Sequence, residues 1–63
     1  MNEVYQIFRD TKRTTNIAES KLIELRKMAI SKNLESLSVF VLKVIGDIHL
    51  IQGDLDDMEE NFL

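Results

Sequence analysis

A stripe of apolar residues runs through the second half of the chain. Between residues 34 and 62, apolar side chains recur at alternating intervals of three and four residues without interruption. The stripe consists of Leu34, Leu37, Val41, Val44, Ile48, Ile51, Leu55, Met58 and Phe62. A 3.5-residue repeat keeps one face of a helix turned toward a neighbouring helix along its whole length. The sequence therefore predicts one long helix over about residues 34–62 that packs along a partner helix.

The first half carries a weaker stripe with the same spacing. Its members are apolar residues, alanines and threonines: Val4, Phe8, Thr11, Thr15, Ala18, Leu22, Leu25 and Ala29. A chain reversal near residues 32–35 would set the two stripes antiparallel, with small residues of one facing large residues of the other. Asn33 suits this turn, because Asn tolerates the left-handed conformation that often ends a helix. Ser36 is expected to cap the helix that follows.

Two versions of the first half follow from the segment 12–16. This segment contains two β-branched threonines and Asn16, which are weak helix formers, and Asn16 followed by Glu19 has the spacing of a capping box. In one version a single long helix leads into the turn. In the other, a short leading helix over about 2–13 precedes a helix over about 16–32. Both versions are all-α antiparallel helical hairpins.

Dimerisation is the next expectation, because so short a chain buries little surface. The 63 residues form one domain, 1–63, without Cys and with one His, so neither a disulfide nor a metal or cofactor site is predicted. Many apolar side chains lie off both stripes and would leave a lone hairpin with exposed patches. A homodimer would cover them as a four-helix-type bundle. The residues expected at an interface are Tyr5, Ile7, Phe40, Leu42, Ile45 and Leu50.

The sequence shows no arrangement typical of an enzyme. His49 has no acid or base within reach along its own helix, and the serines have no adjacent base to activate them. The first hypothesis is a small, non-enzymatic protein–protein interaction module: an adaptor, an assembly factor or an inhibitor of a larger protein. The first 20 residues lack an apolar signal core, and charged residues interrupt the apolar stretch 39–51, so a cytoplasmic protein without a membrane span is expected.

The two halves of the chain carry opposite charge. Residues 1–32 hold seven bases and four acids, a net charge of +3, whereas residues 33–63 hold one base and seven acids, a net charge of −6. The basic half supports a second hypothesis, a dimeric nucleic-acid-binding regulator that neutralises phosphates. Its contacts would be Arg9, Lys12, Arg13, Arg26 and Lys27. Ion pairing between the halves is the competing interpretation, because the chain is acidic overall and no aromatic residues alternate with the bases.

A third hypothesis rests on a short motif. The segment Gln52-Gly53-Asp54-Leu55-Asp56 resembles the Ser-x-Glu-Leu-Asp signature of the small helical-hairpin aspartyl-phosphate phosphatases of sporulating bacteria. Leu55 and Asp56 match outright, Asp54 stands in place of Glu, and Gln52 replaces Ser. The resemblance covers roughly ten residues. It implies that Asp56 acts beside a phosphoryl group and that the partner is a response regulator.

Overall fold

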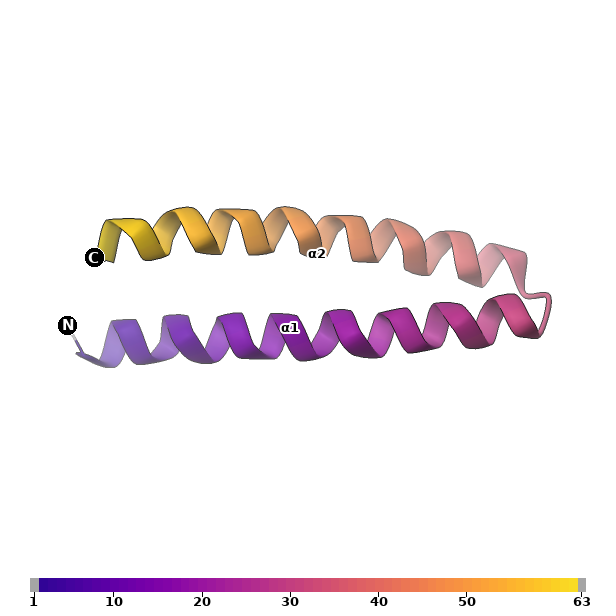
Figure 1. Ribbon diagram of the computed structural model, residues 1–63, viewed down its shortest axis with the longest axis horizontal. Helices are drawn as coiled ribbons and strands as arrows, with labels where there is room; N and C mark the ends of the chain where they lie inside the picture. Colours follow the sequence, from indigo (N-terminus) through magenta and orange to yellow (C-terminus); the bar gives the residue numbers. More distant parts are fainter. Residues whose placement is uncertain (1, 63) are drawn as a thin grey trace.

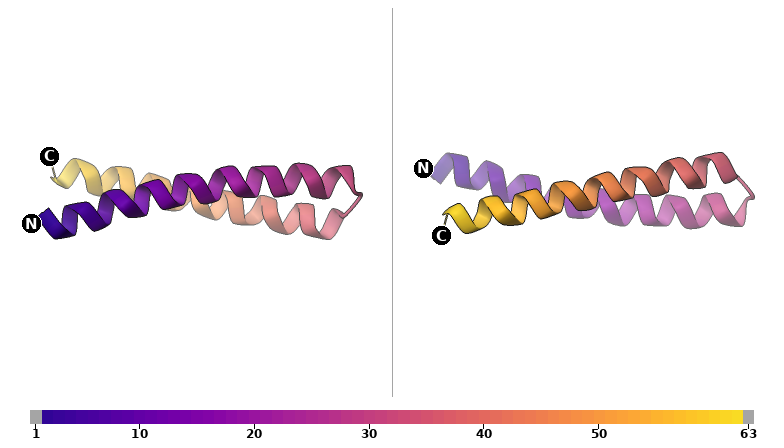
Figure 2. Two further views of the ribbon diagram at one scale, coloured as in Figure 1. Left: turned by 90° about the horizontal axis from the view of Figure 1, so that it is seen from below. Right: turned by 90° about the horizontal axis from the view of Figure 1, so that it is seen from above.

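A computed structural model describes residues 2–62 of the chain, with the side chains of residues 3–61. This part consists of two antiparallel helices, α1 over Asn2–Ser31 and α2 over Glu35–Phe62. The helices lie side by side in a hairpin 48 Å long (Figure 1), and the two side views show them crossing at a shallow angle (Figure 2). The predicted all-α helical hairpin is confirmed. The last member of the apolar stripe, the side chain of Phe62, lies outside the described side chains.

Helix α1 is continuous, so the version with a short leading helix is wrong. The hydroxyls of Thr11 and Thr15 each donate a 2.8 Å hydrogen bond to the carbonyl oxygen four residues earlier, which satisfies these polar groups inside the helix. Asn16 and Glu19 do not form a capping box, because both side chains contact α2 instead. Tertiary contacts therefore override the weak helix propensity of segment 12–16.

The turn has the geometry expected for a helix that ends at a left-handed residue. Asn33 has a φ of 59°, its N–H donates to the carbonyl of Ile30 at 3.1 Å, and the N–H of Leu34 donates to the carbonyl of Ala29 at 2.9 Å. This pair of bonds is the Schellman motif, in which the residue at positive φ closes the helix. The predicted turn is thus confirmed. The predicted cap is wrong, because Ser36 already lies inside α2.

The centre of the helix–helix interface follows a seven-residue spacing. Its members are Phe8, Thr15, Leu22 and Ala29 from α1, and Val41, Ile48 and Leu55 from α2, and four of the seven are buried while three are half-buried. These central residues are every second member of the predicted stripes. The other members do not face the partner helix squarely: in α2, Leu37, Ile51 and Met58 are 37%, 47% and 52% exposed. Each helix is therefore rotated away from the orientation that the stripe predicts.

Candidate interaction surface

Two flanks run along the hairpin, one on either side of the central residues. In an α-helix, the residue four positions after a central residue lies on one side of it, and the residue three positions after lies on the other. The four-after residues, together with the adjoining Asn16, His49 and Asp56 that contact the other helix, form what we call the polar flank: Lys12, Asn16, Glu19 and Arg26 in α1, and Ile45, His49, Gln52, Asp56 and Glu59 in α2. Arg9, Ile23 and Leu42 occupy the same helical positions as those three and are exposed. The three-after residues and their neighbours form the apolar flank: Val4, Ile7, Thr11, Thr14, Ala18, Lys21, Leu25 and Met28 in α1, and Leu37, Phe40, Val44, Asp47, Ile51, Asp54 and Met58 in α2.

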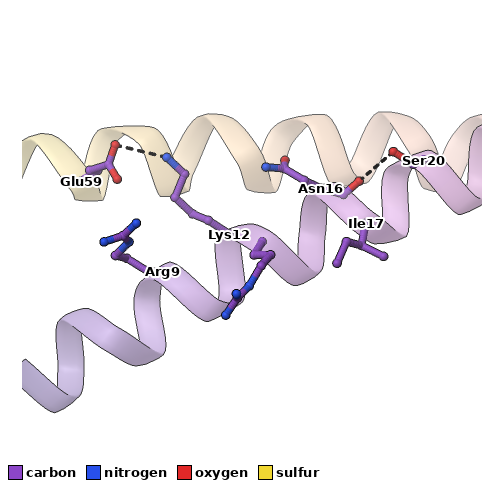
Figure 3. Close-up of a pocket in the computed structure, with 7 residues that line it drawn as sticks. Arg9, Lys12, Asn16, Ile17, Ser20 and Glu59 are labelled. Atoms are coloured by element: carbon purple, nitrogen blue, oxygen red, sulfur yellow. Dashed lines mark hydrogen bonds and ion pairs between the residues drawn. The ribbon is translucent and has the colours of Figure 1, made fainter.

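The polar flank is closed by contacts between the helices. The Lys12 Nζ lies 3.1 Å from Oδ1 of Asp56 and donates a hydrogen bond to Oε1 of Glu59 at 3.2 Å (Figure 3). One turn further along, Gln52 Nε2 donates a 2.8 Å hydrogen bond to Oδ1 of Asn16. Because these residues come from the four-after side of both helices, that side is shared across the hairpin.

Lys12 is the best-connected charge of this flank. Hydrogen bonds to Asp56 and then to Glu59 raise the pKa of Lys12 above its ordinary value of 10.5, because both carboxylates favour the charged ammonium. Its side chain is 28% exposed, so water screens the pairs in part. The contacts orient α2 against α1 more than they stabilise the fold.

Glu19 and His49 form a second link across the polar flank. Oε2 of Glu19 lies against Nε2 of His49, a contact that becomes an ion pair when the imidazole is protonated. This oxygen is buried without a hydrogen-bond partner among the described residues, so the contact lacks hydrogen-bond alignment. Sequence reasoning missed this partner of His49 because it considered neighbours along one helix. Nearer the turn, Arg26 is half-buried, and its Nε likewise has no hydrogen-bond partner.

The apolar flank has no such closure. Val4, Ile7 and Met28 of α1 are 59%, 66% and 55% exposed, and on α2 Phe40 is 62% exposed. All six four-after residues of the polar flank are half-buried, whereas only two of the six three-after residues of the apolar flank are, namely Ala18 and Val44. The hairpin thus covers polar side chains better than the apolar side chains opposite, which is the reverse of what hydrophobic burial favours. The rotation of the helices brings the charged and amide groups together and leaves the other half of the stripes facing outward.

The six residues predicted at an interface do not gather on one surface. Ile7 and Phe40 lie on the apolar flank, near opposite ends of the hairpin, and both are exposed. Tyr5 and Ile45 are half-buried, Ile45 at a four-after position, and the ring of Tyr5 stacks on Phe8 with centroids 6.3 Å apart. The remaining two, Leu42 and Leu50, are 49% and 71% exposed and lie off the apolar flank.

The proposed nucleic-acid contacts divide into two groups. Arg9, Lys12 and Arg13 line one shallow depression with Glu59, where Lys12 reaches across to α2 (Figure 3). Arg13 also pairs with Asp10 on its own helix. Arg26 and Lys27 lie 13 or more residues further along α1, about 20 Å away at 1.5 Å per residue. The depression therefore contains acid as well as base, and the second pair does not extend it.

The acidic end of α2 brings together no metal site. Among the described residues, no group of three or more His, Cys, Asp or Glu side chains could hold a metal ion. Asp56, the residue singled out by the phosphatase-like motif, is 70% exposed at its side chain and pairs with Lys12, whereas the adjacent Leu55 is 8% exposed in the helix–helix interface.

Helix α2 also has a membrane-compatible composition. Between Glu35 and Asn61 it is long and apolar enough to cross a membrane by length and composition alone, although Lys43 and Asp47 lie in its apolar part. The expectation of no membrane span rested on the stretch 39–51, which charged residues interrupt, whereas the complete helix meets the length requirement.

Comparisons with protein-family models, with curated proteins and with solved structures found no match to this chain.

Proposed function

We propose that this chain is a small, non-enzymatic, cytoplasmic interaction module that self-associates through its apolar flank. The observation that supports the proposal is the inverted burial of the two flanks, with half-buried charges on one side and exposed Leu, Ile, Val, Met and Phe on the other. Soluble monomers rarely expose so many large apolar side chains along one face. A second copy of the chain would cover the apolar flank, because a symmetric dimer pairs the same surface of both copies.

In this proposal, the two flanks have different functions. The polar flank holds the hairpin in one register, because each of its charged or amide groups near the open end faces a complementary group on the other helix. The apolar flank supplies the free energy of association. Exposed apolar residues off this flank, among them Val39, Leu42 and Leu50, remain for a larger protein partner that the module would recruit or inhibit.

The test compares two neighbouring residues of α2. Ile51→Lys places a charge on the apolar flank, and Leu50→Lys places the same charge on the outer face. Sedimentation equilibrium of the unmodified chain at micromolar concentration should give twice the 7.3 kDa monomer mass. Ile51→Lys should raise the dissociation constant at least about a hundredfold, because both copies bury an unpaired charge. Leu50→Lys should leave it within about twofold.

Three outcomes would overturn the proposal. A compact monomer at micromolar concentration would show that the apolar flank does not self-associate. Equal effects of Ile51→Lys and Leu50→Lys would show that the dimer uses another surface. Stable partitioning of the pure chain into vesicles of neutral lipid, lost in Ile51→Lys, would assign the same flank to a membrane.

The two other hypotheses have separate tests. A nucleic-acid regulator acting through Arg9 and Arg13 should be retained on nucleic acid at low salt, and the absence of retention would remove this hypothesis. A phosphatase-like regulator should lose activity on an acyl-phosphorylated response regulator with Asp56→Ala. An unchanged rate of phosphate loss would end that hypothesis, and the pairing of Asp56 with Lys12 favours a structural role for this carboxylate.

A further inference from the structure

The apolar flank constrains how two hairpins fit together. If helices stay aligned, two-fold symmetry allows two arrangements of the dimer. In the first, both turns lie at the same end, and α1 of each copy packs against α2 of the other. In the second, the turns lie at opposite ends, α1 packs against α1, and α2 packs against α2. Both arrangements presuppose the proposed self-association.

The distribution of apolar side chains along the flank favours the first arrangement. Near the turn the flank consists of Leu25, Met28, Leu37, Phe40 and Val44, all of them apolar. Toward the termini it mixes apolar residues with polar ones: Val4, Ile7, Thr11, Thr14, Ile51, Asp54 and Met58. When the turns lie at the same end, the apolar part of one flank packs against the apolar part of the other. Turns at opposite ends place the turn half of each flank on threonines and Asp54 of the other copy, which buries polar groups without partners.

Charge favours the same arrangement. Residues 1–32, which include α1, carry +3, and residues 33–63, which include α2, carry −6. Packing α1 against α2 of the second copy surrounds each helix with helices of opposite sign. Packing α2 against α2 brings two strongly acidic helices together, and like charges across a helix interface oppose association.

The register of the hairpin predicts which residues of the two copies would be in contact. Within the hairpin, the contacts Lys12–Asp56, Asn16–Gln52 and Glu19–His49 join residues at the same height. A two-fold axis parallel to the helices preserves height, so the same register applies between copies. On the apolar flank it sets Met28 level with Phe40 of the second copy and Lys21 level with Asp47 of the second copy. Lys21 and Asp47 are both exposed in the single hairpin.

We infer that the dimer is a four-helix bundle with both turns at one end, in which α1 of each copy packs against α2 of the other, Met28 meets Phe40, and Lys21 meets Asp47. The surface that each copy offers is thus complementary to itself in hydrophobicity and charge. Every helix of this bundle has two antiparallel neighbours of opposite charge.

The absence of cysteine in the chain permits a direct distance measurement. A spin label attached to Ser36→Cys marks the exposed start of α2, next to the turn. With turns at the same end, the distance between the two labels should be below about 30 Å, since helices pack 8–10 Å apart. With turns at opposite ends it should be about 40 Å or more, because the hairpin is 48 Å long. A label at Ser20→Cys, near the middle of α1, is the control, because its distance differs little between the arrangements.

The result separates the two proposals. A long Ser36→Cys distance in a protein of dimeric mass would overturn the arrangement and leave self-association intact. A monomeric mass would overturn self-association itself. A charge exchange gives an independent check: Lys21→Asp and Asp47→Lys should each weaken the dimer about fivefold at low salt, and the double variant should restore it. Failure of the double variant to restore association would also overturn the proposed contact between Lys21 and Asp47.

Discussion

The two flanks of the hairpin are built from the same helices but differ in which side chains they bury. On the polar flank, half-buried Lys12 and Gln52 are joined across the helices to the exposed Asp56 and Asn16. The apolar flank contains the groups that gain most from burial, and most of them remain exposed. In the proposed dimer, specificity within one chain and affinity between chains would therefore be assigned to different sides of the same two helices.

The largest expected effect concerns Leu55, which lies at the centre between the flanks and is 8% exposed. Leu55→Ala should lower the free energy of unfolding by about 2–4 kcal/mol, through lost burial and a cavity between the helices. Urea unfolding followed by circular dichroism measures the loss. Leu50→Ala, at a side chain that is 71% exposed, should change it by less than about 0.5 kcal/mol. Equal losses in the two variants would show that the helices do not pack through the central residues.

A smaller effect is expected in the melting temperature, which tests whether the apolar flank self-associates. In the proposed dimer, association and folding are linked, so the melting temperature should rise by about 5 °C for each tenfold increase in protein concentration. The Ile51→Lys variant should melt at a temperature independent of concentration, with Leu50→Lys again behaving as the unmodified chain. A melting temperature of the unmodified chain that does not change with concentration would mean that the flank contributes nothing to stability.

A weaker effect is expected on the polar flank. Asn16→Ala removes the 2.8 Å hydrogen bond between the helices and should cost about 0.5–1.5 kcal/mol. Gln6→Ala is a matched control, because the amide of Gln6 donates to Asp10 on the same exposed helix face. Neither variant should alter the dimeric mass. A change of mass with Asn16→Ala would show that the polar flank also takes part in association.

The smallest effect is the pH dependence of Lys12. Its pKa is raised in the folded state by Asp56 and Glu59, so its contribution to stability is fully present below pH 10.5 and is lost as pH rises through the higher folded value. Thermal unfolding of Lys12→Gln should therefore differ from that of the unmodified chain by a constant amount at neutral pH. The difference should vanish at strongly alkaline pH. A difference that persists there would assign the effect to packing of the lysine stem.

The hairpin itself could be predicted because its signals are local and repeated. The uninterrupted spacing from Leu34 onward indicates a long helix, and Asn33 marks a residue that tolerates positive φ. The rotation of the helices could not be predicted from the spacing. A stripe with two members per heptad is compatible with facing the partner helix by both members or by one, and the choice depends on which polar groups find partners.

The partners of the polar groups could not be predicted from the sequence either, because they depend on how the two helices are rotated against each other. Asn16 and Glu19 have the spacing of a helix start, yet the structure uses them to contact Gln52 and His49 across the hairpin. One sequence pattern does indicate that polar residues lie beside the helix–helix interface. Lys12, Glu19 and Arg26 recur every seven residues, four positions after Phe8, Thr15 and Leu22 of the first stripe, which is the place of charged residues beside a helix interface.

The turn at Asn33 has a mechanical consequence. It joins the helices at one end, and both termini emerge together at the other (Figure 1). A pulling force applied through the two termini would load the contacts between the helices one after another, beginning at the open end with the packing of Phe8 and then the ion pair of Lys12 and Glu59. Such peeling needs far less force than shearing all the contacts at once. If the hairpin is tethered by both termini, its two helices would separate from the open end toward the turn. If it is tethered by one terminus, the hairpin would carry no load.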